Sequence, residues 1–285
     1  MKVATQLKEL TNNPNYIHRQ NSSILAALKT FGDSVMDCRA DNAVLPWPPM
    51  LPYVHPAYWN GGRRFFYIGR DTFGWDLGGG GFSDFFDKYD QGDFAGYLAM
   101  NASALPLEKR ATGWAGWTGS FWHAMNLLHL RIRLGRIVES DAEVANEKAV
   151  LAEMGYGNLN SIELPESLQN EKCWDNIDKD KYWRIKAASQ KHLDRYELLF
   201  DAFQPDVSII ASWSGSEDDY FEGMEHEKIS DETKGKLKVA VYRVSKGNSS
   251  SIVVWTYHPS YSPRIKVRDT EPVEAIASVV ERYAN

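Results

Sequence analysis

The chain has 285 residues, of which 43% are hydrophobic and 25% are charged, with 32 basic and 38 acidic side chains. These fractions are typical of a globular protein with a sizeable core, so they exclude general disorder. The formal net charge of −6 excludes an overall electrostatic attraction to DNA or to an anionic membrane, although it is compatible with a local basic patch.

Sequence signals for membranes, secretion and metals are weak. No apolar run approaches the roughly 20 residues of a membrane helix, and the first ten residues are too polar for a secretory leader. Cys38 and Cys173 lie far apart, without the spacing of a metal site or a disulfide framework. We therefore expect a cytoplasmic monomer without metal or organic cofactor. Residues 1–285 are interpreted as one domain, with 1–60 as a helical and proline-rich N-terminal extension.

The first half of the chain alternates between helical and extended patterns. Residues Ser22–Cys38 have apolar side chains at helical spacing, whereas Leu45–Pro56 contains five prolines and is typical of an extended surface loop. Arg64–Gly69 is a short apolar run bounded by glycines, which predicts a buried strand. The loop that follows contains four consecutive glycines, Gly78–Gly81, and such density indicates flexibility or close approach of the backbone to a ligand.

The second half continues this alternation. Helical patterns cover Gly119–Arg136, Lys181–Phe203 and Glu271–Tyr283, and strand patterns cover Asp206–Trp213, Leu237–Val244 and Ile252–Tyr257. The acidic stretch Glu217–Glu232 is interpreted as a solvated loop or helix face. Three arginines near 131–136 fit either the end of a helix or a phosphate contact. Strands separated by helices predict a three-layer α/β/α protein with a mainly parallel central sheet of four strands.

Three of the predicted strands are followed by polar residues that can do chemistry. These residues are Arg70 and Asp71, Ser214–Ser216, and His258 with Ser260. In parallel sheets the loops after the strands form the functional site. The three loops therefore form one candidate site.

The motifs at these strand ends resemble the uracil-DNA glycosylase superfamily. IGRDTFG (Ile68–Gly74) is similar to the family's water-activating loop, Gly-Gln-Asp-Pro-Tyr, and NLNSIEL (Asn158–Leu164) to its Leu-Asn-Ala-Val strand end. SIIASWSGS (Ser208–Ser216) resembles Leu-Leu-Trp-Gly-Ser, and TYHPSYS (Thr256–Ser262) resembles the His-Pro-Ser-Pro loop. The four matches follow the family's order from about residue 64 to the end of the chain, with insertions at 84–107 and 217–232.

The resemblance implies that Asp71 and His258 have different roles in the cleavage of an N-glycosidic bond. Asp71 would orient water and stabilise the positive sugar, and His258 would donate to the carbonyl oxygen of the departing base. The alternative for Asp71 is an ordinary turn aspartate, and for His258 a loop histidine. The base must first leave the DNA stack and enter a pocket.

The base pocket is assigned to Asn160, Phe82, Phe73 and Arg70. An amide presents a donor and an acceptor, so Asn160 fits a uracil edge or, turned over, a cytosine edge, with Asn158 as the rival reader. Phe82 matches the family's stacking ring, and Phe73 lies where members place a tyrosine near C5. For either phenylalanine taken alone, a position in the core is the favoured alternative.

DNA contacts are assigned to three loops. Ser260, Ser214 and Ser216 are candidates for phosphate contacts, and Arg264-Ile265-Lys266 for a wedge flanked by cations that enters the vacated stack. A polar edge strand is the alternative for 264–266.

Two substrates follow from this comparison. Gly74, the glycine run and the insertions suggest a pocket wider than a uracil site, so a C5-modified cytosine, for example a glucosylated one in phage DNA, stands beside uracil. Loop tryptophans (Trp59, Trp75, Trp114 and Trp117) would stack on such a sugar, and the protein would then act in antiviral defence. The alternative from another class is a module that binds DNA or an altered base without cutting it.

Overall fold

The computed structural model describes residues 22–39, 44–60, 62–71, 81–104, 120–138, 140–170, 172–212, 217–234, 237–259 and 270–284. The chain forms two compact units. Unit 1 comprises Met1–Tyr53, Asp71–Ala104 and Asn158–Phe203, and unit 2 comprises Val54–Arg70, Leu105–Gly157 and Gln204–Asn285. Together they make an α/β protein whose described residues contain one seven-stranded mixed sheet.

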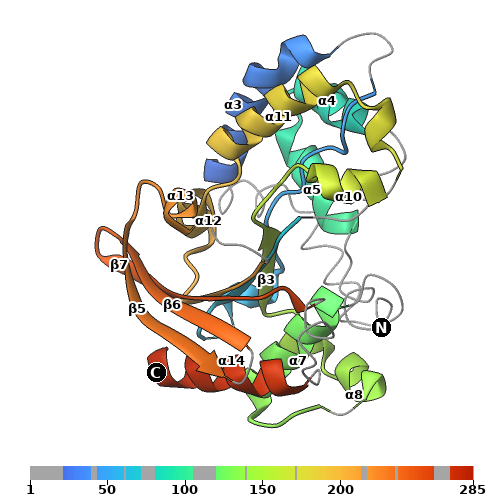
Figure 1. Ribbon diagram of the computed structural model, residues 1–285. Helices are drawn as coiled ribbons and strands as arrows, with labels where there is room; N and C mark the ends of the chain where they lie inside the picture. Colours follow the sequence, from blue (N-terminus) through green and yellow to red (C-terminus); the bar gives the residue numbers. More distant parts are fainter. Residues whose placement is uncertain are drawn as a thin grey trace. The chain divides into compact units, whose positions relative to one another are not determined.

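Unit 1 is helical. Its elements are α3 (Ser22–Val35), η1 (Met36–Cys38), α4 (Phe82–Asp90), α5 (Phe94–Ala104), α10 (Pro165–Asn170), η3 (Trp174–Asn176), α11 (Lys179–His192) and α12 (Tyr196–Phe203). Helix α3 packs against α11 and α12 and buries Ile24, Leu28, Phe31 and Val35 (Figure 1). The predicted helix at 22–38 is thus confirmed, and its apolar face forms part of the core of this unit.

Two predictions for unit 1 need correction. The proline-rich segment 45–56 is extended but not a surface loop, since Pro46, Pro48, Pro49, Met50 and Leu51 are all buried. Its backbone is bound by its surroundings, as Leu51 N donates to Asn101 Oδ1 (3.0 Å) and Met50 N to Ser161 O (2.9 Å). The predicted helix at 181–203 is interrupted between α11 and α12, where Leu193 N and Asp194 N both donate to Ser189 O.

Unit 2 contains nearly the whole sheet. Its strands are β1 (Tyr53–Val54), β2 (Phe65–Gly69), β3 (Met154–Asn158), β4 (Val207–Ala211), β5 (Glu225–Lys234), β6 (Leu237–Lys246) and β7 (Ser249–Thr256), in the order β1-β3-β2-β4-β7-β6-β5. β2, β4 and β7 are parallel neighbours, and β6 and β5 extend the sheet in antiparallel fashion. The acidic stretch 217–232 is therefore not a single loop or helix face: it begins with the short helix α13 (Glu217–Tyr220), and its second half forms β5 at the edge of the sheet, where charges discourage pairing with other chains.

The helices of unit 2 include η2 (Pro56–Trp59), α7 (Ser120–Leu134), α8 (Asp141–Asn146), α9 (Lys148–Leu151), α13 (Glu217–Tyr220) and α14 (Thr270–Tyr283). Helix α14 packs against α7, β6 and β7 (Figure 1). Helix α7 ends at Leu134 and is followed by Gly135, whose φ of +70° is the left-handed geometry that glycine adopts readily. The predicted helices at 119–136 and 271–283 are confirmed.

Strand β3 was not among the elements that apolar patterning predicted. Its sequence, Met-Gly-Tyr-Gly-Asn, has two glycines in five residues. The reason for the first is steric: a Cβ at Gly155 would lie 2.3 Å from the Phe66 ring and 3.0 Å from Val54 Cγ1. The glycine lets β3 approach the neighbouring side chains of the sheet.

We expect Gly155→Ala to destabilise the protein by about 1–3 kcal/mol, because the buried Phe66 ring has to move. Chemical denaturation measures this change. Phe66→Leu in the same chain should make room for the new methyl group, so the double variant loses less stability than the two single variants summed. Strict additivity would contradict the proposed contact.

Candidate functional site

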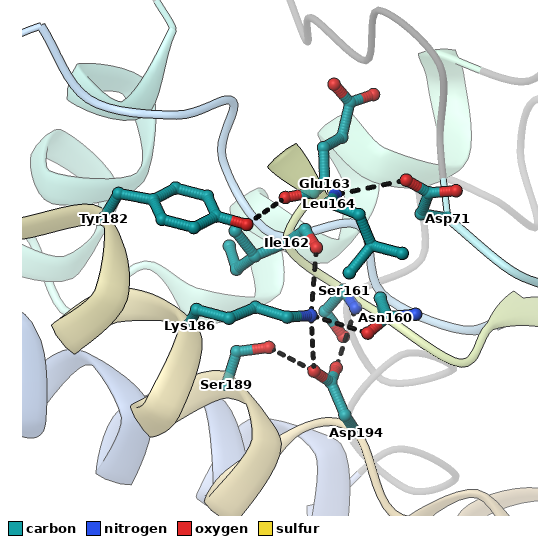
Figure 2. A network of polar contacts seen from close by, with 10 residues as sticks. All are labelled: Asp71, Asn160, Ser161, Ile162, Glu163, Leu164, Tyr182, Lys186, Ser189 and Asp194. Carbon is teal, nitrogen blue, oxygen red and sulfur yellow. Dashed lines mark hydrogen bonds and ion pairs between the residues drawn. The ribbon is translucent and has the colours of Figure 1, made fainter. Parts of the chain in front are cut away.

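The loop that follows β3 is held by side chains. Four consecutive residues, 161–164, each have a main-chain group bound by a side chain of unit 1 (Figure 2): Ser161 N by Asp194 (2.7 Å), Ile162 O by Lys186 (3.2 Å), Glu163 O by Tyr182 (2.9 Å) and Leu164 N by Asp71 (3.1 Å). Buried backbone groups need such partners when no neighbouring strand supplies them. The loop therefore has one well-defined shape, and two predicted site residues belong to it or bind it.

Asp71 is fixed on this loop. Its Oδ2 accepts hydrogen bonds from Leu164 N (3.1 Å) and from the hydroxyl of Ser167 (2.6 Å). Leu164 immediately precedes α10, and its own carbonyl accepts from Ser167 N and Leu168 N. The carboxylate is thus oriented by donors on both sides of the start of a helix.

The side chain of Asn160 is held by a buried ion pair. Lys186 on α11 donates to Asn160 Oδ1 (2.6 Å) and lies 3.6 Å from Asp194 Oδ2, and the side chains of Lys186 and Asp194 are each only 4% exposed. Asp194 also accepts from the hydroxyl of Ser189 (2.5 Å). The rival reader, Asn158, donates instead to the sulfur of Met50 (3.1 Å). The structure thus links Asn160, rather than Asn158, to the ion pair that fixes the loop.

Unit 2 gathers a second set of residues at one edge of its sheet. Because β2, β4 and β7 are parallel, the residues after them, Arg70, Ser212 and His258, follow strand ends at the same edge. After β2 the next strand of the chain, β3, lies on one side of β2, whereas the strands that follow β4, which are β5, β6 and β7, all lie on the other side of β4. Such a divergence between adjacent strands is where open α/β sheets bind ligands.

His258 is a neutral imidazole near pH 7. Its half-buried ring stacks on Phe121 of α7, with ring centroids 5.8 Å apart and planes 17° from parallel. Burial, and secondly the positive charge of Arg70, lower the pKa of His258 to about 4. A neutral imidazole still donates one ring N–H, so His258 retains the hydrogen-bond donor that its assigned role requires.

Other predicted residues have different surroundings. Phe82 is 3% exposed and packs with Phe31, Phe85 and Phe86, so its ring belongs to the core of unit 1. The arginines near the end of α7 form ion pairs with glutamates, as Arg131 does with Glu274 and Glu281. These pairs agree with arginines that belong to the end of a helix, which was the alternative to a phosphate contact. Several candidates lie outside the described residues: Phe73, Ser214, Ser216, Ser260, Arg264, Ile265, Lys266, Trp75, Trp114 and Trp117.

Sequence reasoning missed the residues that support the loop. Tyr182, Lys186 and Ser189 follow one another at helical spacing and share the buried face of α11 with Ile185. A lysine inside such a stripe was the available signal, since a buried lysine requires a partner. Asp194 carried no comparable pattern.

Within the described ranges, no three histidine, cysteine, aspartate or glutamate side chains are grouped so that they could hold a metal ion, and no helix is long and apolar enough to cross a bilayer. Comparison of the chain with protein-family models, curated protein sequences and solved structures returned no match.

We expect NMR titration of the His258 ring to show a midpoint near pH 4. Because the unfolded histidine takes up its proton near pH 6.5, stability should decline as the pH falls from about 6.5 toward 4. Arg70→Met should raise the midpoint by removing a like charge, yet leave it below 6.5 because burial persists. Arg63→Met, at the opposite end of β2, should not move it. A wild-type midpoint at 6.5 would contradict this account.

Proposed function

We propose that this protein is a DNA glycosylase that hydrolyses the N-glycosidic bond of a flipped-out pyrimidine and leaves an abasic site. The base is uracil or a C5-enlarged cytosine, such as a glucosylated cytosine in phage DNA. The observation that carries the proposal is the loop after β3, on which two residues chosen from distant motifs, Asp71 and Asn160, are fixed by hydrogen bonds. A chance motif match gives no reason for the two to share one loop.

The carboxylate suits the sugar side of the reaction. Cleavage builds positive charge on the sugar, and an oriented anion stabilises it and directs a water molecule to the anomeric carbon. The donors from Leu164 and Ser167 hold Asp71 in one orientation, so little reorganisation accompanies the reaction.

The residues at the strand ends suit the base side. Negative charge develops on the departing base, and the neutral His258 stabilises it with a ring N–H. Arg70 contributes a permanent positive charge whose field already acts on His258. The same cation disfavours an imidazolium there, so donation without full proton transfer is the role that the electrostatics support.

The finer architecture belongs to the same proposal. We assign β3, β2, β4 and β7 to a glycosylase-like, mainly parallel core within a three-layer α/β/α fold, with β6 and β5 as an addition. The divergence of the chain between β2 and β4 supports this assignment. DNA itself would be held by Ser214, Ser216, Ser260 and the Arg264-Ile265-Lys266 wedge.

The direct test incubates the protein with DNA containing uracil, with unmodified DNA and with glucosylated phage DNA, followed by alkali. Strand breaks that appear only after alkali report abasic sites. We expect Asp71→Asn, whose amide oxygen can still accept from Leu164 and Ser167, to lower the rate by orders of magnitude. His258→Ala should lose roughly 10²–10³-fold, as is usual for one preorganised donor. Asp87→Asn and His226→Ala, on exposed surfaces of α4 and β5, are the matched controls.

The outcomes of this assay separate the candidates. Binding of a modified DNA without any abasic sites would replace the proposal by the non-cutting recognition module. Equal rates for wild type and Asp71→Asn would remove Asp71 from the mechanism.

A second expectation concerns pH. Since the pKa of His258 is about 4, the histidine is neutral throughout the range from about pH 6 to 8. The single-turnover rate should therefore not decline across this range through loss of an imidazolium. A decline centred near pH 6.5 that disappears in His258→Ala would show instead that the protonated ring is the active form.

A further inference from the structure

Besides the main chain of the loop, Lys186 in unit 1 binds the side-chain amide of Asn160. Its ammonium group contacts Asn160 Oδ1 at 2.6 Å, Ile162 O at 3.2 Å and Asp194 Oδ2 at 3.6 Å. The residue is 3% exposed, and Asp194 is held in turn by Ser161 N and Ser189 (Figure 2). The ammonium group is therefore held in one position next to the amide oxygen of Asn160.

This contact decides which way the amide faces. An ammonium group has three donors and no lone pair, so the amide atom against it has to be the oxygen. Figure 2 shows the amide nitrogen of Asn160 on the side away from Lys186. The reversed amide would set N–H groups against a buried cation and leave the cation short of an acceptor, and both changes are costly in a dry environment.

The two pyrimidine classes require opposite amide orientations. A 4-oxo base such as uracil presents an acceptor at C4 and a donor at N3, whereas a 4-amino base such as cytosine presents a donor at C4 and an acceptor at N3. An amide that rotates freely pairs with either edge, and an amide that is fixed pairs well with one. Wrong pairing leaves buried polar groups unmatched, and this is how a hydrogen-bonding site rejects an analogue.

We propose that Lys186, held by Asp194, is a positioning residue that fixes the amide of Asn160 and so determines whether the protein accepts 4-oxo or 4-amino pyrimidines. This inference rests on the proposed function, because it requires Asn160 to read the base. The bond to Ile162 O and the pairing with Asp194 hold the main chain of the loop. The bond to Asn160 Oδ1 in addition fixes the orientation of the amide, and this is the effect that the experiment isolates.

The experiment uses the full chain and pairs of oligonucleotides that differ only at C4: uracil with cytosine, and 5-hydroxymethyluracil with 5-hydroxymethylcytosine. The ratio of single-turnover cleavage rates within each pair is measured. Wild type should favour one C4 group in both pairs. Lys186→Met should reduce this ratio roughly tenfold or more, in line with the discrimination that one bidentate pairing supplies. Lys191→Met, exposed on the same helix, should leave the ratio unchanged.

Conservative variants keep the test decisive if Lys186→Met does not fold, which circular dichroism reports. Lys186→Arg retains a cation without lone pairs and should preserve the ratio. Lys186→Gln has both a donor and an acceptor, so it tolerates either amide orientation and should lower the ratio. Equal ratios in these two variants, or an unchanged ratio in a folded Lys186→Met, would overturn the inference and leave the glycosylase proposal standing.

Failure of the proposed function gives a different result. Wild type would then leave no abasic sites in any of the oligonucleotides, and the same pairs are compared by binding affinity. A preference that Lys186→Met abolishes supports the inference for a binding module. Equal preferences in both proteins, or no binding by wild type, overturn it.

Discussion

The ion pair between Lys186 and Asp194 is the interaction on which the loop at 160–164 depends. Burying two charges requires compensation by good geometry and further hydrogen bonds, and here the loop at 160–164 and Ser189 provide them. Removal of one partner from such a pair usually costs roughly 3–5 kcal/mol, because the other charge stays buried. The two sides of this contact support each other. Residues of the loop supply hydrogen-bond partners for Lys186 and Asp194, and these two side chains supply partners for the main-chain groups of Ser161 and Ile162. A loop with one conformation is the result.

Unit 2 has a different source of order. Its parallel strands β2, β4 and β7 are buried along most of their length. Their register fixes where β2 and β7 end, and therefore where Arg70 and His258 follow them. Phe121 stacks on the ring of His258. Burial is the main cause of the low pKa of His258, and the positive charge of Arg70 is the second.

Sequence patterns predicted the elements that bury one consistent face. Phe65–Gly69 and Val207–Ala211 are short, mostly apolar runs that are buried throughout, and α3 and α14 have clear helical stripes, so these elements agree with the structure. Strand β3 was not predicted because two of its five residues are glycines, which carry no hydrophobic signal, and Gly155 is required by the close approach of Phe66. Strand β5 escaped because its charges suit a sheet edge as well as a loop. Helical spacing places Tyr182, Lys186 and Ser189 on one face of α11, but it does not indicate which distant main-chain groups these side chains bind, so their support of the loop was not predicted.

Arg70 and Asp71 both follow β2, and the expectation that functional residues lie after parallel strands selected both of them. That expectation did not distinguish one residue from the other. The structure gives the two charges separate tasks: Arg70 acts on His258 in unit 2, whereas Asp71 binds Leu164 and Ser167 in unit 1. A reaction that separates a positive sugar from a negative base needs a fixed anion for one fragment and a fixed positive potential for the other. In the proposed glycosylase reaction, Asp71 would supply the anion, oriented by Leu164 and Ser167, and Arg70 would supply the positive potential, whose effect is already seen in the lowered pKa of His258.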